Sequence, residues 1–203
     1  MASRYADAMP LGTVTMKYRV RLIILALVGL LLSLGLITTS SPQVQAQADE
    51  EAPAAAEISG SYTDPLERFQ VGILSGFSID TVANAPLFQN ADGSLAYTVT
   101  VEPLGTDSPV SLPDAELLRT AQAVFGDGEG FQTQGFQAVD GGLEIAWRGR
   151  LSQTGPPVPI QGKILAKQQG NAIYLLMVAA TETGVDQLDT AIILLSRTLA
   201  IAT

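Results

Sequence analysis

The sequence predicts an α+β domain in which an antiparallel β-sheet is flanked by helices. Three observations point to this class. Most of the chain after residue 68 alternates apolar and polar residues with the period of a strand. Short turns rich in Gly, Asn and Asp separate these runs, which favours hairpins and antiparallel pairing. Two segments, 111–125 and 185–202, instead repeat apolar residues at the three- and four-residue spacing of an amphipathic helix.

The first predicted strands are short and flank a glycine turn. Phe69–Leu74 and Phe77–Ile79 lie on either side of Ser75-Gly76, so we expect a hairpin at the entrance to the domain. A turn at Asn90–Gly93 then leads into Leu95–Val101. In this run Leu95, Tyr97, Val99 and Val101 alternate with Ala96, Thr98 and Thr100, which predicts a strand with two chemically different faces.

The first predicted helix begins after Ser111-Leu-Pro113 and ends near Phe125. The Ser111 hydroxyl is expected to cap it, Pro113 suits its first turn, and Asp114 and Glu116 favour the positive helix end. Its apolar stripe consists of Leu117, Leu118, Ala121 and Val124 or Phe125. The glycine-rich segment 126–130 ends it.

Three strands follow, after the glycine-interrupted segment 131–139. In 143–151, Leu143, Ile145, Trp147 and Leu151 alternate with Glu144, Ala146, Arg148 and Arg150, so Trp147 is expected in the core. The run 158–165 alternates less cleanly, and Ala172–Ala180 is continuously apolar, which predicts a central strand covered on both faces. The last segment, 185–202, is predicted to be a docking helix with Leu188, Ile192, Leu195 and Leu199 on one face.

Residues 1–46 have the pattern of an export signal. Lys17, Arg19 and Arg21 precede the apolar run Leu22–Ile37, and the small residue Ala46 suits cleavage. We expect translation to begin at Met16 and cleavage to follow Ala46, which exports the protein to the periplasm or the thylakoid lumen. The alternative is an uncleaved segment that anchors the protein in a membrane. Residues 47–61 are predicted to be an acidic flexible linker, and 62–203 the folded domain.

Composition excludes several classes of function. Without residues 1–46 the chain carries 7 Lys and Arg against 19 Asp and Glu, a net charge of −12, which disfavours nucleic-acid binding. The sequence has no Cys and no His, so disulfides, histidine-based triads and imidazole metal sites cannot form. Ser75 and Ser196 are isolated hydroxyls, and the Asp127–Gly130 loop is better explained as a connection than as a Ca²⁺ site. We therefore expect no enzyme, cofactor or metal.

Three passages resemble the PsbP/Mog1-like family of photosystem II lumenal subunits and small exported bacterial proteins. They are Gly76–Ile79 with Ala91–Tyr97, Gly162–Leu165 with Asn171–Leu176, and the final helix ending Leu195–Leu199. The resemblance implies an α/β/α sandwich. It further implies a non-catalytic accessory domain that acts by protein contact at a membrane face.

One cluster of charge is a candidate binding surface. Arg148, Arg150, Lys163 and Lys167 supply four of the seven cations outside the signal, and alternation on neighbouring strands places them on one face. We expect a docking patch for an acidic partner protein or a lipid headgroup, against the alternative of an ordinary solvated face. A second function left open is that of an envelope protein which binds a small ligand between sheet and helices.

Overall fold

The computed structural model describes residues 56–82, 84–105, 111–152 and 156–202. The predicted signal 1–46, with Met16, Leu22–Ile37 and the cleavage site after Ala46, lies outside these residues, as does most of the predicted linker. Among the helices formed by the described residues, none is long and apolar enough to cross a membrane.

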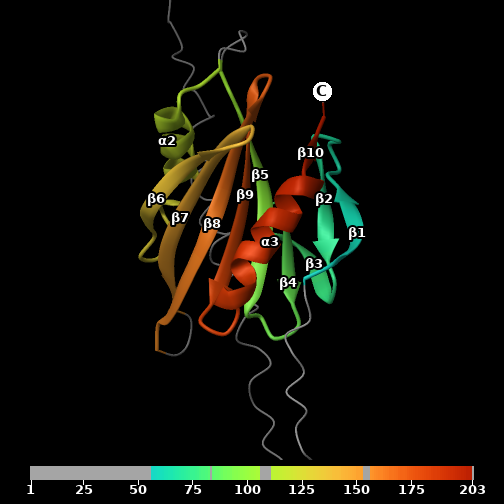
Figure 1. Cartoon of the computed structure of the whole chain (residues 1–203), viewed down its shortest axis with the longest axis vertical. Coiled ribbons are helices and arrows are strands. Elements are labelled where there is room, and N and C mark those ends of the chain that lie inside the picture. Colours follow the sequence, from blue (N-terminus) through green and yellow to red (C-terminus); the bar gives the residue numbers. More distant parts are fainter. Residues whose placement is uncertain (1–55, 83, 106–110, 153–155, 203) are drawn as a thin grey trace, which may run out of the picture.

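A seven-stranded antiparallel sheet forms the centre of the fold (Figure 1). Its strand order is β3-β4-β5-β9-β8-β7-β6, and every neighbouring pair is antiparallel. The strands are β3 Phe77–Val82, β4 Ala85–Asn90, β5 Leu95–Pro103, β6 Gln132–Val139, β7 Gly142–Leu151, β8 Val158–Gln169 and β9 Ala172–Thr181. Strand β9 lies between β5 and β8 with Ile173–Ala180 buried, which confirms the predicted central strand.

The two faces of this sheet are covered differently. On one face, called here the α3 side, lie helix α3 (Val185–Thr198) and a small sheet in the order β1-β2-β10. Its strands are β1 Ile58–Thr63, β2 Phe69–Leu74 and β10 Ala200–Ile201. On the other face, the α2 side, helix α2 (Asp114–Phe125) packs against β6, β7 and β8. The antiparallel α+β class with two helices is thus as the sequence predicts, with unequal cover on the two faces.

The start of the domain differs from the prediction. Strand β2 pairs with β1 and β10, whereas β3 pairs with β4, so the hairpin predicted around Ser75-Gly76 is wrong. Gly76, at φ 79°, instead turns the chain from the small sheet into the large one. Strand β1 also includes Ile58–Ser61 of the predicted linker, because its order comes from the backbone ladder with β2 rather than from burial.

The predicted start of α2 and the predicted end of α3 also differ from the structure. Pro113 occupies the N-cap of α2 and no side chain caps it, so the predicted role of Ser111 is wrong. Helix α3 ends at Thr198 rather than near Ala202, because Leu199 is extended at ψ 96° and Ala200–Ile201 pair with Phe69–Gln70 as β10. The apolar stripes are confirmed: Leu117, Ala121, Val124 and Phe125 are buried in α2, and Leu188, Ala191, Ile192 and Leu195 in α3.

The hydroxyl of Tyr97 joins the two sheets. Its ring is fully buried on β5, and its O–H donates to the Gly72 carbonyl (2.8 Å) while accepting from the Leu74 N–H (3.2 Å). Strand β10 pairs with Phe69 and Gln70, so these groups lie where β2 has no strand neighbour on that side among the described residues. The Thr198 hydroxyl of α3 accepts from the Gly72 N–H in the same region (3.0 Å). Side chains therefore complete the edge of β2.

Side-chain hydrogen bonds also hold the turn between β1 and β2. The buried Asp64 carboxylate accepts two bonds from the Arg68 guanidinium, Nε to Oδ2 (2.6 Å) and Nη2 to Oδ1 (2.8 Å), and also the backbone N–H groups of Leu66 and Arg68. The Arg68 side chain, foremost, holds the pKa of the Asp64 carboxyl below its usual value. The carboxylate thus accepts backbone N–H groups of the turn that have no partner strand.

Replacing Tyr97 with Phe should leave a buried carbonyl and a buried N–H of β2 unpaired. We expect the free energy of unfolding to fall by about 2 kcal/mol, measured by urea denaturation. Tyr174→Phe is the control, because Tyr174 is also buried but its hydroxyl makes no hydrogen bond within the described chain. Equal effects of the two substitutions would show that the Tyr97 hydroxyl does not join the sheets.

Asp64 should make stability depend on acid pH. Because its folded pKa is lowered, its contribution is present above the unfolded value of about 3.9 and is lost as the pH falls through the folded pKa. Asp64→Asn should cost about 2 kcal/mol at neutral pH, a figure reduced by the partial exposure of Arg68. The variant's loss of stability below about pH 4 should be shallower than that of the unsubstituted protein. Glu67→Gln, an exposed change in the same turn, should leave neutral stability unchanged.

Candidate functional site

The four predicted cations lie on the α3 side of the sheet. Strand register places Arg148 opposite Gln161 and Ala146 opposite Lys163, while Lys167 follows Ala166, the partner of Leu143. Because directly paired residues share a face, all four project to the side on which Leu165 meets the α3 core. The expectation that alternation gathers them on one face therefore agrees with the register of β7 and β8.

Lys163 belongs to an ion-pair network. Its ammonium lies 3.0 Å from Oε1 of Glu144 and 2.7 Å from Oδ1 of Asp189 on α3. Burial on its own lowers the pKa of Lys163, but the bonds to Asp189 and Glu144 outweigh it and raise that pKa above its usual value. Asp189 thereby ties α3 to β8. Lys163 is thus committed to holding the helix.

Lys167 lies at the other end of the face, away from the arginines. A small hollow there is lined by Asp140, Glu144, Lys167 and α3 residues that include Ile193. This hollow therefore brings two carboxylates and the lysine to the same region of the surface. The four cations consequently do not form one continuous positive patch.

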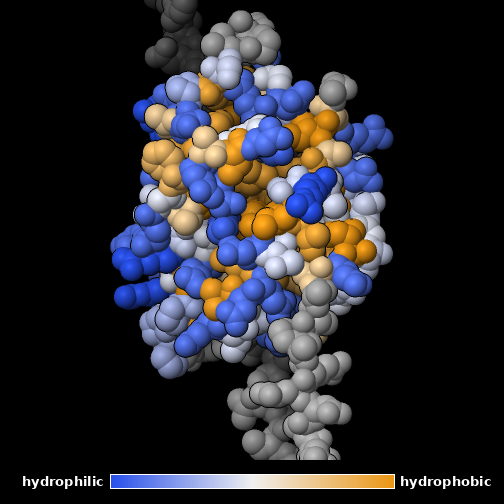
Figure 2. Space-filling view, in the orientation of Figure 1, coloured by the Kyte–Doolittle hydropathy of each residue, from blue (hydrophilic) through white to orange (hydrophobic). Residues whose placement is uncertain are grey.

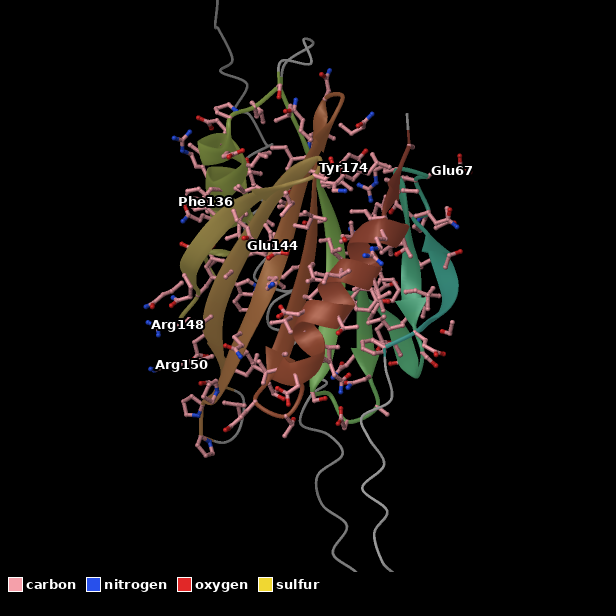
Figure 3. All side chains as sticks on the ribbon, viewed as in Figure 1. Glu67, Phe136, Glu144, Arg148, Arg150 and Tyr174 are labelled. Atoms are coloured by element: carbon pink, nitrogen blue, oxygen red, sulfur yellow. The ribbon has the colours of Figure 1, made fainter. Side chains whose placement is uncertain are left out.

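Arg148 and Arg150 carry the remaining positive charge. Both are exposed and extend from β7 toward the outer edge of the sheet (Figure 3). The Arg148 guanidinium donates from Nε (3.2 Å) and Nη2 (2.8 Å) to the Gln132 side-chain oxygen on β6. Within the described part of the chain, neither arginine forms an ion pair with a carboxylate. These two guanidinium groups can therefore accept an external anion without first breaking an internal pair.

The arginines line an open groove of about 780 Å³, called here the arginine groove. Its walls include Gln132, Arg148, Arg150, Gln161, Glu182 and Val185. Glu182 is the acidic side chain among the described residues that line it. Figure 2 shows strongly hydrophilic surface at the lower left edge of this face, with apolar patches higher on the same edge and closer to α3.

The groove exists because α3 covers only part of its face. Helix α3 packs mainly against β9, β8, β5 and strand β2 of the small sheet, and it meets β6 and β7 only at Val139 and Glu144, which line a hollow beside it. The polar residues of β6 and β7 on this side consequently stay exposed, with the pattern of a sheet face in contact with water. Gln132 and Gln161 are site residues that the sequence does not indicate, because glutamine carries no periodic or charge signal and the register alone brings them beside Arg148.

Other candidates have structural roles. The Asp127–Gly130 segment connects α2 to β6, with the Glu129 carbonyl accepting the Arg150 N–H (2.9 Å) and the Glu129 carboxylate accepting the Ser152 hydroxyl (2.6 Å). The Ser196 hydroxyl donates to the Ile193 carbonyl within α3. Trp147 is buried against Phe131 in the α2-side core, which confirms its predicted position. In the described ranges, no group of three or more acidic side chains is arranged to hold a metal.

The α2 side holds a second polar feature. The side-chain oxygens of Gln89, Thr98 and Thr100 are buried without a hydrogen-bond partner among the described residues. Thr98 lies opposite Leu87 on β4 and Met177 on β9, so its surroundings are apolar. The larger cavities lined by described residues do not include these three side chains. The arginine groove is thus the stronger candidate site.

Comparison with known proteins supports the fold and leaves the family undefined. No family model matches the chain, and no curated protein is significantly similar in sequence. Among solved structures, the chain is similar to cyanobacterial PsbP (CyanoP) from Synechocystis sp. PCC 6803, with 10% identity, a TM-score of 0.50, and coverage of 83% of this chain and 99% of that one. This likeness shows a PsbP-like fold, as the sequence resemblance implied.

Two further structures are more distant. LpqN, involved in cell envelope biogenesis of Mycobacterium tuberculosis, has 15% identity and a TM-score of 0.42, with 66% of this chain and 83% of that chain covered. A Bacteroides thetaiotaomicron protein has 12% identity and a TM-score of 0.46; 71% of this chain matches 48% of that one.

The two ion pairs of Lys163 should contribute unequally to the free energy of unfolding. Asp189 is largely exposed, so Asp189→Asn should lower the free energy of unfolding by about 0.5 kcal/mol. Lys163→Met should cost about 1–2 kcal/mol, because it leaves the mostly buried Glu144 carboxylate without its cation. Urea denaturation of the single variants and the double variant measures both terms. Equal losses in the two single variants would contradict this assignment.

Proposed function

We propose that this chain is an exported, non-catalytic accessory domain that binds an acidic partner protein at a membrane face, in the periplasm or the thylakoid lumen. The observation that carries the proposal is the pair of exposed arginines in the arginine groove, which form no ion pair with a carboxylate of the described residues. Without residues 1–46 the chain has a net charge of −12, so two adjacent cations on an open face stand out against an acidic body.

Two further observations support this function. The run Leu22–Ile37 behind a basic head is typical of exported proteins. The fold likeness to cyanobacterial PsbP agrees with an accessory role, although at 10% identity it bears on fold and not on activity. The proposal therefore depends on the arginine groove rather than on the likeness.

A second candidate function uses the same groove. Its volume of about 780 Å³ is large enough for a small anionic ligand, and it lies between the sheet and the start of α3, near Val185. A saturable rise in melting temperature with a small anion would favour this ligand-binding function. Its wide opening to solvent favours a protein surface, because small-ligand sites enclose most of their ligand.

Charge reversal tests the docking function. Arg148→Glu with Arg150→Glu should abolish co-isolation of the protein with a native membrane complex at low salt, because each change turns attraction into repulsion. The matched control reverses Arg119 and Arg197, which are exposed on α2 and α3 outside the groove, and thus changes the net charge equally. Co-isolation that is equal for both double variants, or insensitive to salt, would contradict the proposal.

A further inference from the structure

Strand β6 is an exposed edge of the large sheet. It is the last strand in the order, and within the described part of the chain its strand neighbour is β7 alone. Its eight residues, Gln132–Val139, contain no charged residue and no proline. Natural edge strands usually carry such residues, which prevent another strand from pairing with them. Strand β6 carries neither of these protective residue types.

The ladder of β6 has one irregularity. The register shifts between Thr133 and Gly135, so Gln134 is an extra residue relative to β7. Beyond it, Gly135–Val139 pair with β7 residue by residue, from Ala146 to Gly142. This stretch offers a regular backbone edge of five residues, long enough to template a short extended segment.

The arginines reach toward this same edge. Arg148 contacts Gln132 at the beginning of β6, and the Arg150 side chain runs close to Gly130, where a Cβ added to the glycine would lie 3.5 Å from the arginine Cγ. A strand added outside β6 would lie about 4.8 Å farther out, and where it continues past Gly135 toward Gln132 its side chains on the α3 side would approach the two guanidinium groups. Arg148 uses two of its five N–H donors on Gln132, which leaves three for an incoming carboxylate.

The α2-side face of β6 indicates a second property that an incoming segment needs. Phe136 pairs with Ile145 on the α2 side and is 56% exposed, which is unusual for a large aromatic side chain. An added strand would place a side chain directly beside it, and an apolar residue there would bury the ring. A segment that alternates acidic and apolar residues would therefore match both faces of this edge.

We propose that β6 binds an extended segment of the partner protein by strand addition, with acidic side chains on Arg148 and Arg150 and apolar side chains on the Phe136 face. This inference rests on the proposed function and specifies how the partner is recognised. Backbone pairing supplies the register, and the two arginines select the acidic sequence.

The probe is a fluorescein-labelled peptide that alternates Glu and Val, tested against the purified protein by fluorescence anisotropy. Methylation of alternate peptide nitrogens, which keeps the charge but blocks strand pairing, should weaken binding at least tenfold. Arg148→Glu with Arg150→Glu should also weaken it at least tenfold, whereas reversal of Arg119 and Arg197 should change it less than twofold. Amide hydrogen exchange in 135–139 should slow when the unmethylated peptide is present.

Three results would overturn strand addition. The methylated peptide could bind as tightly as the parent, which would show contact through charge alone and leave the docking function intact. The protein could be a dimer whose 135–139 amides are already protected, which would assign the edge to a second copy. Vesicles of phosphatidylglycerol could bind in an arginine-dependent way while the peptide does not, which would assign the arginines to lipid. Failure of the docking function is distinguished from these results by a separate measurement: co-isolation with the membrane complex would be the same with and without the charge reversal.

Discussion

The attachment of the small sheet to the large one fixes the rest of the architecture. The Tyr97 hydroxyl and the Thr198 hydroxyl bind the backbone of β2 where β10 no longer pairs with it. Gly72 allows this close approach, since a Cβ at this position would lie 2.8 Å from the Thr198 hydroxyl oxygen. Because Thr198 belongs to α3, the same contacts set the position of the helix relative to β2. The small sheet and α3 therefore behave as one cover over β5, β9 and β8.

The position of this cover explains why the arginine groove is open. A helix that is held against β2 at one side and tied to β8 by the Lys163–Asp189 pair leaves most of β6 and β7 uncovered. The polar faces of these two strands stay in contact with solvent, and Arg148 and Arg150 project from them (Figure 3). The groove is thus a consequence of incomplete cover rather than of a separate loop or insertion. A surface that is formed by the register of neighbouring strands is rigid, which suits recognition of a partner by shape and charge.

Much of the fold could be predicted from sequence where apolar and polar residues alternate. Leu143, Ile145 and Trp147 lie on one face of β7 and Arg148 and Arg150 on the other, as their spacing indicates. Strand β4 could not be predicted in this way, because Leu87 and Phe88 are both buried, one on each side of the sheet, and give no alternation. Strand β1 escaped prediction for the opposite reason, since most of it is exposed.

The candidate site was predictable only in part, and for a related reason. Alternation identifies which cations share a face, but it carries no information about which carboxylates arrive from a distant helix. Asp189 reaches Lys163 only through the packing of α3, and this contact removes Lys163 from the set of available charges. Conversely, Gln132 joins the site only because the register places it opposite Arg148. Long-range pairing, not local pattern, separates Lys163 from the two arginines.

The open face beside α3 is the surface proposed to bind the partner. Site-specific photocrosslinking in cells tests this most directly, with a photoreactive phenylalanine placed either at position 161, in the arginine groove, or at position 123, on the exposed side of α2. We expect a discrete protein adduct from position 161 and none from position 123. An adduct from position 123 alone, or the same adduct from both, would contradict this proposal.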